Sequence, residues 1–72
     1  MLIARLETGS THVYELQSDK LHAAKKEAMG LAKPMTSKIV ISSANSWDSE
    51  NQIDLAIRYQ DCKSGKWSGW QS

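Results

Sequence analysis

The chain has 72 residues and a mass of 8.0 kDa, and its 9 basic and 8 acidic side chains leave a net charge of +1. This length predicts one domain over residues 1–72 and excludes a second core or a catalytic domain with a lid. The near-neutral charge excludes a strong polyanion binder, and the mixed composition excludes disorder.

The single cysteine, Cys62, excludes the internal disulfide framework that small secreted domains usually need. No run approaches the roughly 18 apolar residues of a membrane span. The start, Met1–Arg5, lacks the basic and long apolar regions of a signal peptide. These features predict a cytoplasmic protein without a membrane partner.

The first half of the chain predicts a hairpin followed by a helix. Residues 2–7 and 12–17 alternate in polarity around a turn at residues 8–11 that contains Gly9. The apolar period then becomes helical from Asp19 to Ala32, and we expect Ser18 to cap this helix. Pro34 marks the end, because the residue before a proline is pushed out of the α region.

The second half predicts three strands, over residues 38–44, 52–60 and 66–71. In the middle strand, alternation predicts that Ile57 and its odd-numbered neighbours face the helix, whereas Ala56 and Arg58 face away. Gly65 suits the left-handed position of the last turn. Trp67 and Trp70 have opposite parity, which predicts a bulge at Gly69 that re-aims one of them.

The fold class predicted is therefore α+β. Its five-stranded antiparallel sheet has the order ββαβββ, with one helix packed on one face.

No nucleophile motif, phosphate-binding glycine loop or paired-carboxylate spacing stands out in the sequence. His12, His22 and Cys62 lack the spacing of a metal site. We therefore expect a protein that is not an enzyme, with no metal, no cofactor and no small-molecule substrate.

One flank of the predicted helix carries only basic and neutral side chains. On a helical wheel this flank holds Lys25, Met29, His22, Lys33 and Lys26. It is either a solvated face or a cationic strip that docks on phosphates or on an acidic protein surface.

The sheet face opposite the helix is a second candidate surface. Ile3, Val13 and Val40 should lie on it together with Arg58. They are either scattered surface residues or the contact of a homodimer or partner.

Three tryptophans in 72 residues are a further candidate, because tryptophan is enriched in interface hot spots. Trp47 lies in a polar loop, so we expect it to be exposed. Of Trp67 and Trp70, we expect one in the core and one at least half exposed. Aromatic rings that seal the ends of a small sheet are the simpler interpretation.

The stretch from His12 to Trp70 resembles small proteins of phages and mobile elements, most closely the type I-F anti-CRISPR proteins. The residues that carry the likeness are Tyr14-Glu15-Leu16, Ser18, Leu21, Ala24, Lys25, Ala28, Lys38-Ile39-Val40-Ile41, Arg58-Tyr59 and Gly65-Lys66-Trp67. The resemblance implies a sheet around one helix and a binding protein that blocks access of a CRISPR effector complex to DNA. It implies that the lysines Lys25, Lys26 and Lys66 contact that complex.

The function predicted is a binding protein that inhibits a host-defence nucleoprotein complex in the host cytoplasm. Its candidate partner-binding residues are His22, Lys25, Lys26, Lys33, Trp47 and Lys66. Two alternatives stay open: a small nucleic-acid-binding module that uses the same basic strip, and an oligomeric phage structural or assembly protein.

Overall fold

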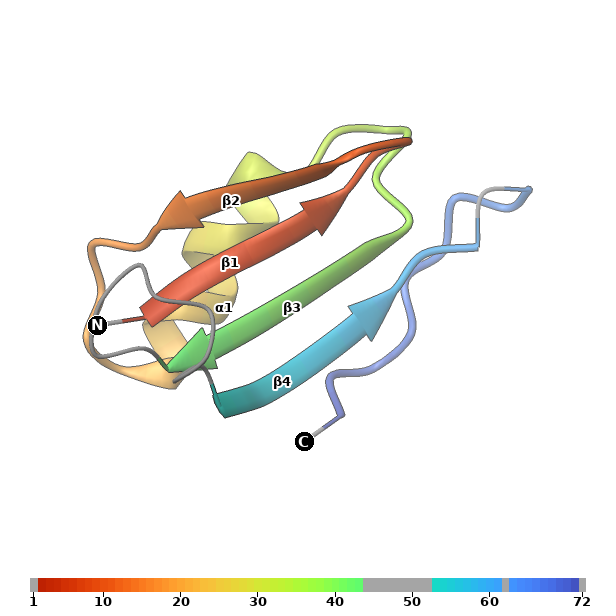
Figure 1. Ribbon diagram of the computed structural model, residues 1–72. Helices are drawn as coiled ribbons and strands as arrows, with labels where there is room; N and C mark the ends of the chain where they lie inside the picture. The colour runs from red at the N-terminus through yellow and green to blue at the C-terminus, as the bar shows by residue number, and fades with distance from the viewer. Residues whose placement is uncertain (1, 44–52, 62, 72) are drawn as a thin grey trace.

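The computed structural model describes residues 2–43, 53–61 and 63–71. One helix packs behind a four-stranded antiparallel sheet, with strand order β2-β1-β3-β4 (Figure 1). The elements are β1 (Leu2–Glu7), β2 (Thr11–Glu15), α1 (Leu21–Leu31), β3 (Lys38–Ser43) and β4 (Ile53–Tyr59). The predicted α+β class is confirmed, but the sheet has four regular strands and not five.

The β1–β2 hairpin closes at Gly9, whose φ of 83° is the left-handed conformation that glycine adopts without a steric penalty. Helix α1 starts later than predicted, at Leu21 with Lys20 as its N-cap residue, and no side chain caps it. Ser18 does not cap the helix because its hydroxyl donates to the Glu27 carboxylate, 3.1 Å away. That bond ties the approach to the helix to its second turn.

The core lies between α1 and one face of the sheet. Ala24 and Ala28 have no exposed surface, and these small side chains let the helix axis approach the strands closely. The helix rests on even-numbered residues of β1 and odd-numbered residues of β3, as the polarity pattern predicted. The buried apolar residues of this core are Leu2, Ala4, Leu6, Leu16, Ala24, Ala28, Ile39, Ile41 and Ala56.

The predicted faces of β4 are wrong in its second half. Ala56 pairs with Ile41 in the core and is 2% exposed, whereas Ile57 pairs with Val40, which belongs to the face away from the helix. A register shift between Ile41 and Ser42 accommodates one extra β4 residue, Leu55. Trp67 and Trp70 from the end of the chain pack against the same core cluster that contains Ala56.

The last segment runs antiparallel along the outer edge of β4 but is too irregular to form a strand. Ser68 N–H donates to Tyr59 O at 2.7 Å, whereas Gln71 exchanges both backbone bonds with Ile57, at 2.7 and 2.9 Å. Between the bridges Gln60–Trp67 and Ile57–Gln71, two residues of β4 therefore lie opposite three residues of the segment. This is the bulge predicted around Gly69, and it explains why the predicted fifth strand breaks into isolated bridges.

Candidate functional site

Cationic and aromatic side chains alternate where α1, β4 and the last segment meet. The Lys25 Nζ lies 5.6 Å from the centroid of the Trp70 ring. The Arg58 Cζ lies 5.7 Å from the Trp70 ring and 5.6 Å from the Trp67 ring. We call Lys25, Trp70, Arg58 and Trp67 the cation–aromatic stack. Each such contact contributes about 0.5–2 kcal/mol, depending on its exposure to water.

The bulge makes this stack possible. In a regular strand, Trp67 and Trp70 would point to opposite faces of the sheet because they are three positions apart, whereas the bulge lets both pack against the core on the helix side. Arg58 is fixed between them because its Nε donates to Ser68 O at 2.7 Å. Both rings are half-buried, so the prediction of one core and one exposed tryptophan is wrong.

The predicted basic flank of α1 is therefore divided among different environments. Lys25 is half-buried on Trp70, whereas His22 and Lys26 are exposed on the outer face of the helix. The one acid of α1 is Glu27, and its carboxylate points back to the chain before the helix. We call His22 and Lys26 the outer helix face.

Glu27 accepts hydrogen bonds from the backbone N–H groups of Gln17 and Ser18, at 2.9 to 3.1 Å, and from the Ser18 hydroxyl. The Gln17 bond and both Ser18 bonds lower the pKa of Glu27 from its ordinary value, against a smaller opposing effect of desolvation. The carboxylate is therefore ionised and engaged within the chain at neutral pH. Its charge is unchanged by these neutral donors, but they hold the carboxylate toward the chain before the helix, and the described residues show no ion pair between it and Lys26.

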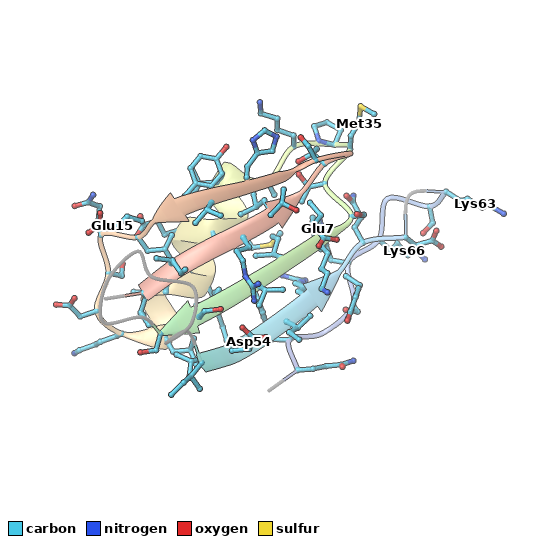
Figure 2. All side chains as sticks on the ribbon, viewed as in Figure 1. Glu7, Glu15, Met35, Asp54, Lys63 and Lys66 are labelled. Carbon is cyan, nitrogen blue, oxygen red and sulfur yellow. The ribbon has the colours of Figure 1, made fainter. Side chains whose placement is uncertain are left out.

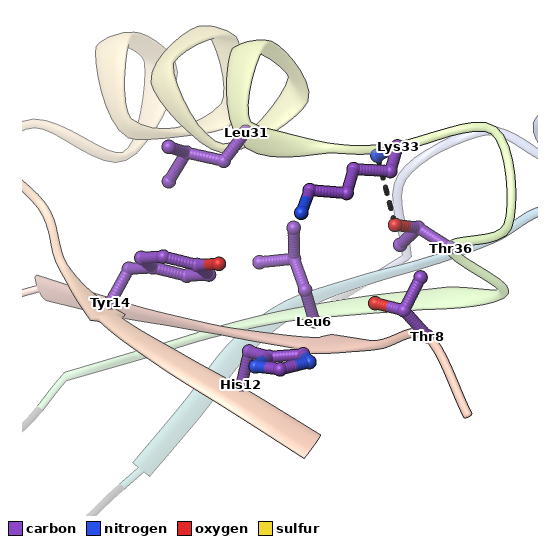
Figure 3. A pocket seen from close by; sticks show the side chains of 7 residues that line it. All are labelled: Leu6, Thr8, His12, Tyr14, Leu31, Lys33 and Thr36. Carbon is purple, nitrogen blue, oxygen red and sulfur yellow. Dashed lines mark hydrogen bonds between the residues drawn. The ribbon is translucent and has the colours of Figure 1, made fainter. Parts of the chain in front are cut away.

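Lys33 follows the end of α1 and lies apart from the other predicted cations. Its side chain enters a pocket of about 160 Å³ between the helix end and β2 (Figure 3). A cation is favourable there, because the helix dipole is negative at its C-terminal end. Its backbone N–H donates to the fully buried Thr36 hydroxyl at 2.9 Å. The pocket is lined by Leu6, Thr8, His12, Tyr14, Leu31, Lys33 and Thr36.

The remaining predicted contacts lie elsewhere. Lys66 and Lys63 are exposed on the last turn, which extends from the end of β4 away from the sheet (Figure 2). Gly65 in that turn has the predicted left-handed conformation, with φ of 73°. Trp47 lies outside the described residues. The structure therefore does not bring the predicted partner-binding residues into one continuous site.

Most residues of the predicted second interface, on the sheet face away from the helix, are not exposed. Ile3 is fully buried and Val40 is 5% exposed, whereas Val13 is 43% exposed. Arg58 lies on the opposite face, within the cation–aromatic stack. The prediction that placed Arg58 on the same face of the sheet as Val13 is therefore wrong.

An ion pair crosses the same face. Arg5 contacts Asp54 at 2.7 Å across β3, and the Ser42 hydroxyl donates to the same carboxylate oxygen at 2.8 Å. Sequence reasoning missed both this pair and the cation–aromatic stack. Arg5 and Asp54 are brought together by the strand register, and Lys25 and Trp70 by the packing of the helix on the sheet, neither of which local sequence reveals.

In the ranges that the structure describes, no three His, Cys, Asp and Glu side chains are grouped as metal ligands, and no helix has the length and apolarity to cross a membrane. The chain matches no protein-family model, no curated protein and no solved structure. A functional argument therefore depends on the geometry above.

Proposed function

We propose that this chain is a non-catalytic binding protein that docks on an acidic macromolecular surface through the outer helix face. The observation that carries this proposal is the internal engagement of Glu27. The helix has a single acid, and three donors before the helix already bind it. Lys26 is exposed, and it makes no ion pair with Glu27 or another acid among the described residues.

The tryptophans favour a protein or ribonucleoprotein surface over single-stranded nucleic acid. Binding of single strands uses aromatic side chains as platforms on which bases stack. Trp67 and Trp70 are half-buried and already packed against Arg58 and Lys25. Exposed lysines alone give weak binding that depends strongly on salt.

The resemblance to type I-F anti-CRISPR proteins makes a type I-F effector complex the first target to test. In this proposal Lys26 meets acidic side chains of the complex and the docked chain blocks target DNA. Charge on the rim of such an interface acts mainly on the association rate.

The test compares two variants with the same change in net charge, Lys26→Glu on the outer helix face and Lys63→Glu on the last turn. Capture of target DNA by the effector complex is measured against increasing concentrations of each protein. We expect the parent and Lys63→Glu to inhibit equally and Lys26→Glu to need at least about tenfold more protein. Absence of inhibition by the folded parent would exclude this target, and equal inhibition by both variants would exclude the outer helix face.

A further inference from the structure

We propose that β2 is a dimerisation edge, which pairs with β2 of a second copy in antiparallel register centred on Val13. The proposal is independent of the function proposed above. It starts from a difference between the two edges of the sheet. The outer edge of β4 is covered by the last segment, whereas β2 pairs with β1 alone in the part of the chain that the structure describes.

The backbone of β2 determines which groups remain available on its outer side. Leu16 N–H donates to Leu2 O at 2.9 Å, so residue 16 directs its backbone toward β1. Backbone direction alternates along an antiparallel strand, so Tyr14 and His12 also bond to β1. Thr11, Val13 and Glu15 therefore direct their N–H and C=O groups outward.

A two-fold axis through Val13 pairs all of these outward groups. Val13 exchanges two hydrogen bonds with Val13 of the second copy, and Thr11 exchanges two with Glu15 of that copy on each side of the axis. The sheet then continues across the dimer. The axis is normal to the sheet, so both copies carry α1 on the same side.

The side chains fit this register. Val13 is 43% exposed and meets its own copy, which buries an apolar pair. On the same face the Thr11 hydroxyl can donate to the Glu15 carboxylate of the other copy, and on the helix face His12 lies opposite Tyr14. No like charges oppose each other.

Three of the usual protections of an exposed edge, lysine, proline and a bulge, are missing from β2, and its one acid, Glu15, lies opposite Thr11 in the proposed register. Natural edge strands avoid pairing through lysine, proline or a bulge. The sequence Thr-His-Val-Tyr-Glu of β2 contains no lysine or proline, and its pairing with β1 has no register shift. Two short β-strands pair weakly, so we expect a dimer that dissociates on dilution.

The test uses amide hydrogen exchange in the unmodified protein, from about 10 μM to about 1 mM, beside sedimentation of the same samples. We expect a shift from monomer to dimer. Exchange at Val13, Thr11 and Glu15 should slow at least about tenfold at the high concentration. Exchange at His12, Tyr14 and Leu16 should stay slow throughout. A protein that sediments as a monomer at every concentration, or a dimer without the change at Val13, overturns the proposal.

Val13→Pro supplies a second, independent arm. Proline removes only an outward N–H at this position, which an edge strand tolerates. We expect a folded monomer, whereas Val13→Thr keeps the N–H and should still form the dimer. If the proline variant loses its circular dichroism, Val13→Lys replaces it, because lysines directly opposite each other repel. A folded Val13→Pro or Val13→Lys variant that dimerises like the parent overturns the proposal.

Discussion

Glu27 shows how one side chain can replace a missing helix cap. Helix α1 has no side-chain capping bond at Lys20, so its start needs another constraint. The Glu27 carboxylate supplies one, because it accepts from the N–H groups of Gln17 and Ser18 and so fixes the chain that leads into the helix. A residue in the second turn thus sets the direction in which the helix begins.

Glu27→Gln should therefore change how stability depends on pH. The pKa of Glu27 is lower in the folded chain because of its bonds to Gln17 and Ser18. Its contribution is fully present above the ordinary glutamate pKa, about 4.3, and is lost as pH falls through the lower folded value. We expect the variant to be less stable at pH 7 and to lose less stability on acidification, as measured by urea unfolding.

Glu7→Gln is the matched control, because Glu7 is exposed at the end of β1. Parallel pH profiles of stability for the parent and Glu27→Gln would mean that, in solution, Gln17 and Ser18 do not bind the Glu27 carboxylate.

At the scale of elements, alternation predicted the position and the faces of β1 and β3, and the helical period predicted α1 to within two residues of each end. It was wrong for the second half of β4 because the extra residue Leu55 reverses the faces of the residues that follow it. The regular alternation of apolar residues in β4 gives no sign of this bulge, which only the pairing of β4 with β3 reveals. The site was predicted less well, because the role of Lys25 depends on a tryptophan 45 positions later in the chain.

The observed faces of the sheet predict that alanine substitution destabilises the protein more at Ile41 of β3 than at Ile57 of β4. Ile41 is fully buried under α1, so Ile41→Ala should cost about 2–4 kcal/mol and lower the melting temperature by more than about 10 °C. Ile57 is half-buried on the other face, so Ile57→Ala should cost about 1 kcal/mol. Thermal denaturation of both variants makes the comparison. A larger loss of stability for Ile57→Ala than for Ile41→Ala would mean that Ile57 faces the helix, as alternation predicted.

The bulge offers a test at the same scale. Deleting Gly69 removes the extra residue, so Trp67 and Trp70 would lie two positions apart and still share the helix side in a regular strand. We expect the near-ultraviolet circular dichroism signal to be retained and the last segment to pair with β4 as a regular strand, with a melting temperature no lower than that of the parent. Gly69→Ala is the control, because an added Cβ meets no atom within 4 Å. A deletion variant that melts well below Gly69→Ala would mean that the bulged backbone, and not only a shared face, positions the tryptophans.

At the scale of the whole molecule, the described part of the chain leaves the β2 edge of the sheet open and closes the β4 edge, and this asymmetry limits how copies can associate. Pairing through β2 alone closes at a dimer, because the two-fold axis uses the same edge on both copies. The last segment protects β4 through the bonds of Ser68 and Gln71. A molecule with two open edges could instead add copies without limit.

A chain that ends at Gly65 should therefore associate beyond the dimer, as measured by light scattering, while circular dichroism monitors whether its sheet remains. The same truncation removes Trp67 and Trp70 from the core, so aggregation could also follow from simple loss of stability.

Ile57→Pro separates these causes. In the full chain it deletes the N–H that donates to Gln71 O at 2.7 Å, so it should lower the melting temperature. In the truncated chain the same proline sits on an open edge, where it blocks strand pairing, so it should reduce association. If edge pairing drives assembly, Ile57→Pro should destabilise the full chain but reduce association of the truncated chain. If unfolding drives assembly, Ile57→Pro should increase aggregation of both chains.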